Sequence, residues 1–165
     1  MKHSFLLIGH RASGKSTLGQ ALAKRFRLPF TDLDAVIEAA EGASAAELVA
    51  KDEAAFRLLE TDALAGLLSR DEAMVIAAGG GLAHVPHGVF VIWISRDGWD
   101  ESDLDERNRL RPELQAEEEI AWMRETREPH YRRSAHVRLH CERCCGEHEA
   151  LERLVLLATW LNASV

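Results

Sequence analysis

Short apolar runs alternate along this chain with longer segments in which apolar residues recur every three or four positions. The runs are typical of strands that are buried on both faces, and the periodic segments are typical of helices that cover a sheet. Strands are expected at residues 4–8, 29–32, 73–78, 89–94 and 136–139. Helices are expected at residues 18–26, 33–40, 44–70 with a break near Lys51–Asp52, 117–134 and 151–161. Because the pattern has no repeats and no Pro/Gly-rich linker, it predicts a single α/β domain over residues 1–165.

A glycine-rich segment joins the first expected strand to the first expected helix. Residues Gly9–Thr17 match the phosphate-loop pattern G-x-x-x-x-G-K-[ST], and they lie between a strand and a helix, as that motif requires. Glycines let successive backbone N–H groups turn around a phosphate, and the start of the helix adds its partial positive charge. The Lys15 ammonium can reach the β- and γ-phosphates of a nucleoside triphosphate, and the Ser16 hydroxyl is placed to bind Mg²⁺. The predicted nucleotide-binding residues are Ala12, Ser13, Gly14, Lys15, Ser16 and Thr17. The alternative is a glycine-rich turn that matches by chance.

Composition narrows the possible partners. With 165 residues and 47% hydrophobic side chains, the chain is long enough for one core, and no segment reaches the roughly 18 apolar residues that span a bilayer. A soluble, cytoplasmic protein is therefore expected, and we expect a monomer. The net charge of −7 argues against nucleic-acid binding. Eight arginines nevertheless cluster between Arg107 and Arg138, which suggests a site for small anions.

Two aspartates follow the second expected strand. Asp32 and Asp34 are two residues apart, so in extended backbone their side chains point the same way. One can hold Mg²⁺ through water while the other accepts a proton from a substrate hydroxyl. The competing interpretation is a turn or N-cap pair at the start of the next helix.

Two further features come from the middle of the chain. Arg57 and Glu60 are one helical turn apart and can form an i,i+3 pair, which alone is most often a solvated salt bridge. The run Gly79–Gly81 at the end of the third strand offers backbone N–H groups with no side chain to block a ligand.

Two arginines near the carboxyl-terminal third are candidates for ligand contacts. Arg111 lies in the polar segment Arg107–Pro112, which can close over a nucleotide and bring an arginine to the transferring phosphate. The competing interpretation is a solvated loop. Arg127, on the helix before the last strand, can bind a carboxylate with two parallel hydrogen bonds, although a single arginine is more often a surface residue.

Histidines and cysteines gather after the last strand. His140, Cys141, Cys144, Cys145 and His148 include a Cys-x-x-Cys spacing. A zinc site usually takes its ligands from two separated pairs, and the chain has no second pair, so reduced cytosolic thiols are the favoured interpretation.

The combination of these motifs resembles the shikimate kinase family over nearly the whole chain, from the phosphate loop to the Arg-x-Pro-x-Tyr stretch at Arg127. The resemblance implies a P-loop fold with a five-stranded parallel sheet in the order 2-3-1-4-5, flanked by helices. It implies transfer of a phosphoryl group from ATP, with Mg²⁺, to shikimate, giving ADP and shikimate 3-phosphate. By the same resemblance, Asp32 assists Mg²⁺ and Glu60 supports Arg57. Shikimate would be bound by Asp34, Arg57, Gly80 and Arg127. The catalytic residues would be Lys15, Asp34 and the lid arginine Arg111, which also contacts the nucleotide. Substrate-binding helices are expected at about 33–62 and the lid at about 103–116.

Two alternatives remain open. A gluconate-kinase-like or related metabolite kinase would keep the phosphate loop without needing Arg57, Gly80 and Arg127 to converge on one carboxylate. A regulatory module that binds nucleotide without turnover is suggested by the short stretch of seven residues between Gly81 and Val89 and by His140–Cys141 after the last strand.

Overall fold

A computed structural model describes residues 3–82, 85, 87–96, 114–142 and 145–164. The strands are β1 (Ser4–Ile8), β2 (Phe30–Asp32), β3 (Val75–Ala77), β4 (Val89–Arg96) and β5 (Val137–Cys141). The helices are α1 (Lys15–Phe26), α2 (Leu33–Glu41), α3 (Ala45–Lys51), α4 (Glu53–Leu68), α5 (Ala116–Ser134) and α6 (Glu147–Ala163). Every strand and helix expected from the periodicity is present, with ends displaced by a few residues. Pro29 lies outside β2, and β4 continues two residues beyond its expected end.

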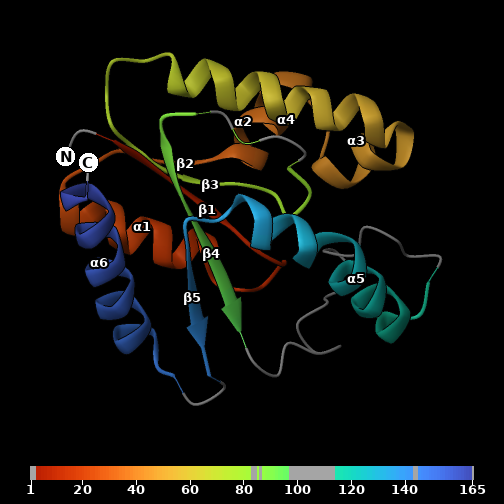
Figure 1. The fold of residues 1–165 in the computed structure, drawn as a ribbon. Helices are drawn as coiled ribbons and strands as arrows, with labels where there is room; N and C mark the ends of the chain where they lie inside the picture. The colour runs from red at the N-terminus through yellow and green to blue at the C-terminus, as the bar shows by residue number, and fades with distance from the viewer. Residues whose placement is uncertain (1–2, 83–84, 86, 97–113, 143–144, 165) are drawn as a thin grey trace.

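The strands form one parallel sheet in the order β2-β3-β1-β4-β5 (Figure 1), which confirms the expected order. Strand β1 lies in the centre, where Leu7 pairs with Ala77 of β3 and with Ile92 of β4. All five residues of β1 are buried, as expected for a strand covered on both faces. Because all strands run the same way, their carboxyl ends meet at one edge, which is where open α/β sheets bind ligands.

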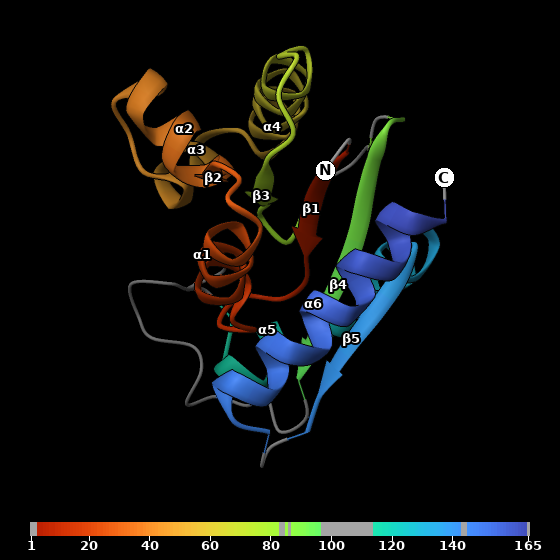
Figure 2. The ribbon, with the colours of Figure 1, turned by 90° about the vertical axis from the view of Figure 1, so that its left-hand side faces the viewer.

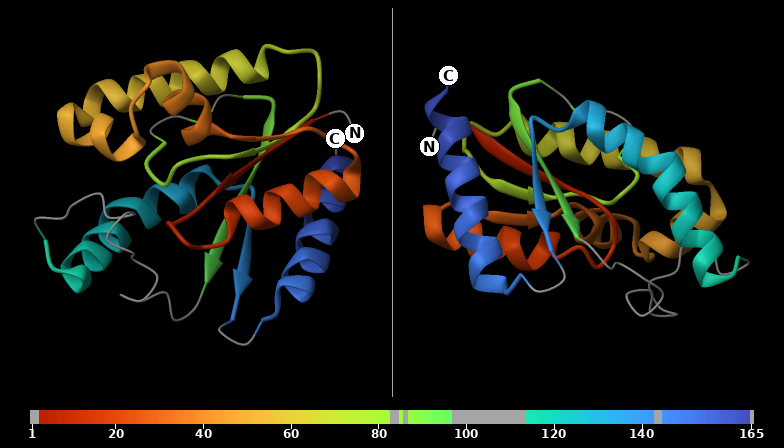
Figure 3. Two further views of the ribbon diagram at one scale, coloured as in Figure 1. Left: turned by 180° about the vertical axis from the view of Figure 1, so that it is seen from behind. Right: turned by 60° about the horizontal axis from the view of Figure 1, so that its bottom comes forward.

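Helices cover both faces of the sheet. Helices α1 and α6 pack on one face, in a core that includes Phe5, Leu22 and Leu154 (Figure 2). The other face is covered by α2, α4 and α5, in a core that includes Leu33, Leu64 and Tyr131. Figure 3 shows α5 and α6 on opposite sides of β4 and β5. The candidate site residues on α1 therefore lie on one face of the sheet, and those on α2, α4 and α5 lie on the other.

Side-chain caps fix the helix starts near the site. The Asp32 carboxylate accepts the Asp34 N–H and so caps α2, and Ser44 forms a capping box with Glu47 at the start of α3. Asp52 ends α3 and caps α4 by accepting the Ala55 N–H, which explains the break expected near Lys51–Asp52. No helix in the part of the chain that the structure describes is long and apolar enough to cross a membrane.

Candidate active site

The loop from Gly9 to Gly14 carries the backbone geometry of a phosphate cradle. A Cβ atom at Gly9 would lie 2.2 Å from the carbonyl oxygen of Ile94, so the loop passes close to β4 only because this residue is glycine. Ala12 has φ 53° and Gly14 has φ 89°, both in the left-handed region. Alternation of left-handed and ordinary backbone conformations can point successive N–H groups into one concavity, and Gly14 is the N-cap of α1, which begins at Lys15. This backbone geometry is compatible with the anion site that the sequence predicts.

Lys15 lies over this loop. Its Nζ donates hydrogen bonds to the carbonyl oxygens of Gly9, at 3.0 Å, and His10, at 2.6 Å. Burial lowers the pKa of Lys15 to about 8, and the nearby carboxylates of Asp34 and Asp32 oppose that shift. An ammonium desolvated in this way interacts strongly with any anion that enters the site.

Ser16 and Asp32 place two oxygen ligands side by side. The Ser16 hydroxyl donates to Asp32 Oδ2 at 2.7 Å, while Asp32 Oδ1 accepts the Asp34 N–H at 3.2 Å. Hydroxyl and carboxylate oxygens are the ligands that Mg²⁺ prefers, and phosphate oxygens and water usually complete its shell. The donor set therefore fits a magnesium ion that accompanies a nucleotide. Asp32 has the competing N-cap role, and this role leaves Oδ2 beside Ser16, where the expected metal ligand would lie.

The expected geometry of the aspartate pair is wrong in one respect. Asp34 lies in the first turn of α2 and not in extended backbone, because the Asp32 cap begins the helix at Leu33. Burial raises the pKa of Asp34, and the charge of Asp32 raises it further. Among the described residues, Asp34 Oδ1 is a buried atom without a hydrogen-bond partner. A desolvated, unpaired carboxylate oxygen is suited to accept a proton from a substrate hydroxyl.

The Arg57–Glu60 pair forms on α4 as expected, but it is not solvated. Arg57 Nη1 donates to Glu60 Oε2 at 2.6 Å and Nη2 donates to Glu53 Oε1 at 3.0 Å. Glu60 is 0% exposed, and burial raises its pKa while the Arg57 charge opposes the increase. Two carboxylates therefore fix one guanidinium in a single orientation, with part of its edge left toward the cavity.

Arg127 approaches the same turn from α5. It is 6% exposed, and its guanidinium lies 5.2 Å from the centre of the Trp122 ring. A Cβ atom at Gly80 would lie 2.9 Å from Arg127 Nη1 and 2.8 Å from the Tyr131 hydroxyl, which donates to the Gly80 carbonyl. Arg127 is thus not a surface arginine, and Gly80 is glycine because these two side chains occupy the space beside it.

One cavity at the carboxyl edge of the sheet joins these groups. Its lining includes Arg11, Lys15, Asp34, Arg57, Gly80 and Arg127. Phosphate-loop residues, the Asp34 carboxylate and the two guanidinium groups therefore face one enclosure. The arrangement can hold a phosphate, a hydroxyl and a carboxylate of two ligands in one enclosure. Arg111 and residues 103–113 of the expected lid lie outside the described residues.

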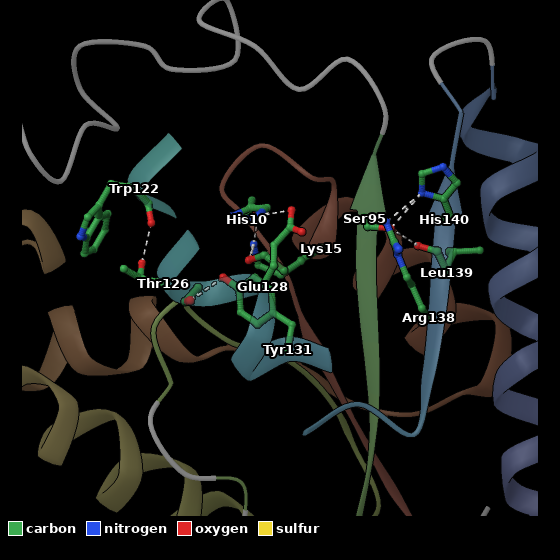
Figure 4. A network of polar contacts seen from close by, with 12 residues as sticks. His10, Lys15, Ser95, Trp122, Thr126, Glu128, Tyr131, Arg138, Leu139 and His140 are labelled. Carbon is green, nitrogen blue, oxygen red and sulfur yellow. Dashed lines mark hydrogen bonds and ion pairs between the residues drawn. The ribbon is translucent and has the colours of Figure 1, made fainter. Parts of the chain in front are cut away.

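Sequence reasoning missed the contact between the phosphate loop and α5. His10 Nε2 lies 3.2 Å from Glu128 Oε1, and the His10 and Tyr131 rings are 5.3 Å apart (Figure 4). Burial lowers the pKa of His10 to about 4, although Glu128 acts to raise it, so the neutral ring donates its N–H to the carboxylate. His10 occupies a position that the motif leaves open, and it therefore gives no sequence signal.

The histidines and cysteines at the end of β5 and beyond it are only partly described. Within the described residues, no group of three or more His, Cys, Asp or Glu side chains is arranged to hold a metal ion. Cys141 and Cys145 are free thiols, and Cys144 lies outside the described residues.

Comparison with known proteins gives consistent matches. A family model described as shikimate kinase matches residues 11–151. A shikimate kinase of Synechococcus sp. (strain JA-3-3Ab) is 45% identical over 96 residues, which cover 53% of this chain and 50% of that protein. This chain thus spans about half the length of the first curated relatives that it matches. The shikimate kinase structure from Aquifex aeolicus has a TM-score of 0.73 at 27% identity, covering 97% of this chain and 98% of that one. The structure of a shikimate kinase from Acinetobacter baumannii in complex with shikimate has a TM-score of 0.79 at 24% identity, covering 95% and 93%, and shows the shared fold.

Proposed function

Because this chain belongs to the shikimate kinase family, we propose that it transfers the γ-phosphoryl group of ATP to a hydroxyl group of shikimate. One observation carries the proposal. Arg57 and Arg127 meet at the Gly79–Gly81 turn, in the same cavity as Asp34 and Lys15. Shikimate is a carboxylate that also bears hydroxyl groups, so it requires cations and a proton acceptor at a fixed separation.

The acceptor site suits a carboxylate because it holds two oriented guanidinium groups. Arg57 is fixed by Glu53 and Glu60, and Arg127 is fixed by its stacking on Trp122. A planar guanidinium can bind both oxygens of a carboxylate, and little entropy is lost when it is already oriented. Gluconate-kinase-like chemistry does not require this convergence, which is why we favour shikimate.

The proposed reaction assigns one residue or group to each chemical step. The acceptor hydroxyl oxygen attacks the γ-phosphorus of ATP, and its proton passes to the Asp34 carboxylate. The bond between the γ-phosphorus and the bridging oxygen breaks, and its electron pair leaves with ADP. Lys15 and the loop N–H groups hold the phosphates, and their positive charge stabilises the charge that develops there. These groups are all present, which supports an active enzyme over a module that only binds nucleotide.

Ser16 and Asp32 would hold Mg²⁺ together with the nucleotide. The ion would neutralise charge on the β- and γ-phosphates and fix their orientation. Removal of divalent cations by a chelator should therefore stop turnover.

A panel of acceptors tests the proposed activity. ADP release would be followed with shikimate, quinate and gluconate at equal concentrations. Shikimate should give the highest kcat/KM. A higher value with gluconate would favour the alternative metabolite kinase.

Truncation of the two acceptor arginines should affect one substrate selectively. Arg57→Ala and Arg127→Ala are expected to raise the KM for shikimate by about ten- to 150-fold, because each removes a charge-assisted hydrogen bond worth about 1.5–3 kcal/mol. The KM for ATP should change little. The ratio of the two KM values is the readout, because it does not depend on the fraction of folded enzyme.

Arg132→Ala is the matched control, because Arg132 is an exposed arginine on the same helix as Arg127. It should leave both KM values unchanged. A rise in the KM for ATP alone in the Arg57 and Arg127 variants would mean that the acceptor site is misplaced.

A methyl group at Gly81 should move Arg57 without unfolding the chain. The new Cβ atom would lie 2.2 Å from Arg57 Cζ, so the guanidinium has to leave its position between Glu53 and Glu60, while no backbone atom is among the three nearest atoms. Gly81→Ala is therefore expected to raise the KM for shikimate about tenfold, which corresponds to the loss of roughly one hydrogen bond. Gly66→Ala is the control, since a Cβ atom there would meet nothing within 4 Å. Equal kinetics in the two variants would contradict the steric role of Gly81.

A further inference from the structure

Arg11 is an additional cation of the active-site cavity. It is the third residue of the loop that begins at Gly9, it is half-buried, and its side chain lines the same cavity as Lys15, Asp34 and the acceptor arginines. The phosphate-loop pattern leaves this position open, so the motif itself assigns Arg11 no role.

The other cations of the cavity have partners within the protein. Arg57 pairs with Glu53 and Glu60, Arg127 stacks on Trp122, and Lys15 donates to two carbonyl oxygens. Among the described residues, the Arg11 guanidinium has no hydrogen-bond or ion-pair partner. A long, partly buried side chain held in one region without a partner has its donors available to a ligand.

Arg11 lines the cavity together with Lys15, Asp34 and Arg127, and its guanidinium interacts electrostatically with these groups. Burial lowers the pKa of Arg11, and so does the charge of Arg127, whereas the Asp34 carboxylate raises it. Arg11 in turn lowers the pKa of Lys15. The positive charge of Arg11 therefore interacts with the charges of both Lys15 and Arg127. Cations gathered in this way repel one another, and an anion between them relieves the repulsion.

The position of Arg11 identifies the group that it can contact. In the proposed reaction, Arg57 and Arg127 would bind the acceptor carboxylate, and the loop with Lys15 would bind the β-phosphate. The remaining anionic group is the phosphoryl group in transit between the nucleotide and the hydroxyl beside Asp34. We propose that the Arg11 guanidinium donates hydrogen bonds to the oxygens of the transferring phosphoryl group and is a further catalytic residue of this enzyme.

This role rests on the proposed phosphoryl transfer and adds a donor to it. As the bond from the γ-phosphorus to the bridging oxygen of ADP breaks and the bond to the acceptor oxygen forms, negative charge is spread over the three other phosphoryl oxygens. A guanidinium that contacts those oxygens stabilises the transition state more than the ground state. Its loss should therefore lower kcat and leave substrate binding nearly unchanged.

The test compares Arg11→Met with Arg11→Lys. Methionine keeps an unbranched side chain and removes the charge, and we expect kcat to fall by about 10²-fold or more. The KM values for ATP and shikimate should stay within about threefold of the wild type. Lysine keeps the charge without the forked donors, so it should restore part of the loss. Arg25→Met, at an exposed arginine of α1 outside the cavity, should behave as wild type.

A second assay separates this proposal from the proposed function. Slow hydrolysis of ATP transfers the same γ-phosphoryl group to water in the absence of shikimate. Arg11→Met should therefore reduce the rate of ATP hydrolysis by about the same factor as it reduces kcat. If the wild type hydrolyses ATP but does not phosphorylate shikimate, the proposed acceptor is wrong. The ratio of the ATP hydrolysis rates of Arg11→Met and the wild type still tests the role of Arg11. An unchanged kcat in Arg11→Met, or a raised KM for shikimate at unchanged kcat, would overturn the proposal.

Discussion

Replacement of Lys15 by alanine is expected to abolish phosphoryl transfer while the chain keeps its fold. The Lys15 ammonium is the cation that the phosphate-loop motif assigns to the β- and γ-phosphates, and the removal of one preorganised donor at a developing charge costs about 10²–10³-fold in kcat or more. In the folded chain burial lowers the pKa of Lys15 to about 8 from its usual 10.5, so the protonated side chain is less stable there than in the unfolded chain. That unfavourable contribution is fully present below pH 8, and its removal should not lower stability at neutral pH.

Two measurements separate the effects on chemistry and on folding. ADP release should fall to background in Lys15→Ala, while far-ultraviolet circular dichroism and the melting temperature should match the wild type. Lys24→Ala, at an exposed lysine of α1, serves as the control and should retain full activity. Turnover near the wild-type level in Lys15→Ala would refute the phosphate-loop assignment.

Asp34→Asn should give the second large loss, because asparagine keeps the size of the side chain and cannot accept the proton. A general base contributes about 10²–10⁴-fold, so kcat is expected to fall by that factor with little change in the KM for ATP. Asp62→Asn, an exposed carboxylate on α4, should have no effect.

The pH profile of the wild type should report the same carboxyl group. Burial and the neighbouring Asp32 charge raise the pKa of Asp34. The base acts only when it is deprotonated, so kcat/KM should be high above that raised pKa and should fall as the pH decreases through it. This acid limb should lie at a higher pH than for an ordinary aspartate and should be missing in Asp34→Asn. An identical acid limb in the variant would assign it to another group.

The sequence predicted the fold well because the fold depends on periodicity and local caps. The apolar strand Ser4–Ile8 is fully buried, and the break between α3 and α4 occurs where Asp52 can end one helix and cap the next. The order of the strands came from the family resemblance, since an apolar run carries no information on which strand lies beside it.

The site was predicted less completely because its geometry depends on distant parts of the chain. Asp32 could be seen as a ligand or as a cap, and only the folded chain shows that one oxygen caps α2 while the other pairs with Ser16. Glu60 is buried by the Gly79 turn, where a Cβ atom would lie 2.6 Å from Glu60 Oε1, and no local pattern around Glu60 indicates this. His10 and Glu128 are 118 residues apart in the sequence, so their contact gives no signal in either segment.

The central claim is that the acceptor is recognised through its carboxylate and then phosphorylated. The most direct measurement is product formation from ATP with shikimate and, in parallel, with its methyl ester, followed by ³¹P NMR and ADP release. With shikimate, we expect one shikimate 3-phosphate for each ADP. With the ester, we expect a kcat/KM lower by about tenfold or more, because Arg57 and Arg127 lose their ionic partner. Equal kcat/KM values for the acid and the ester, or ADP release that does not depend on either, would contradict the account.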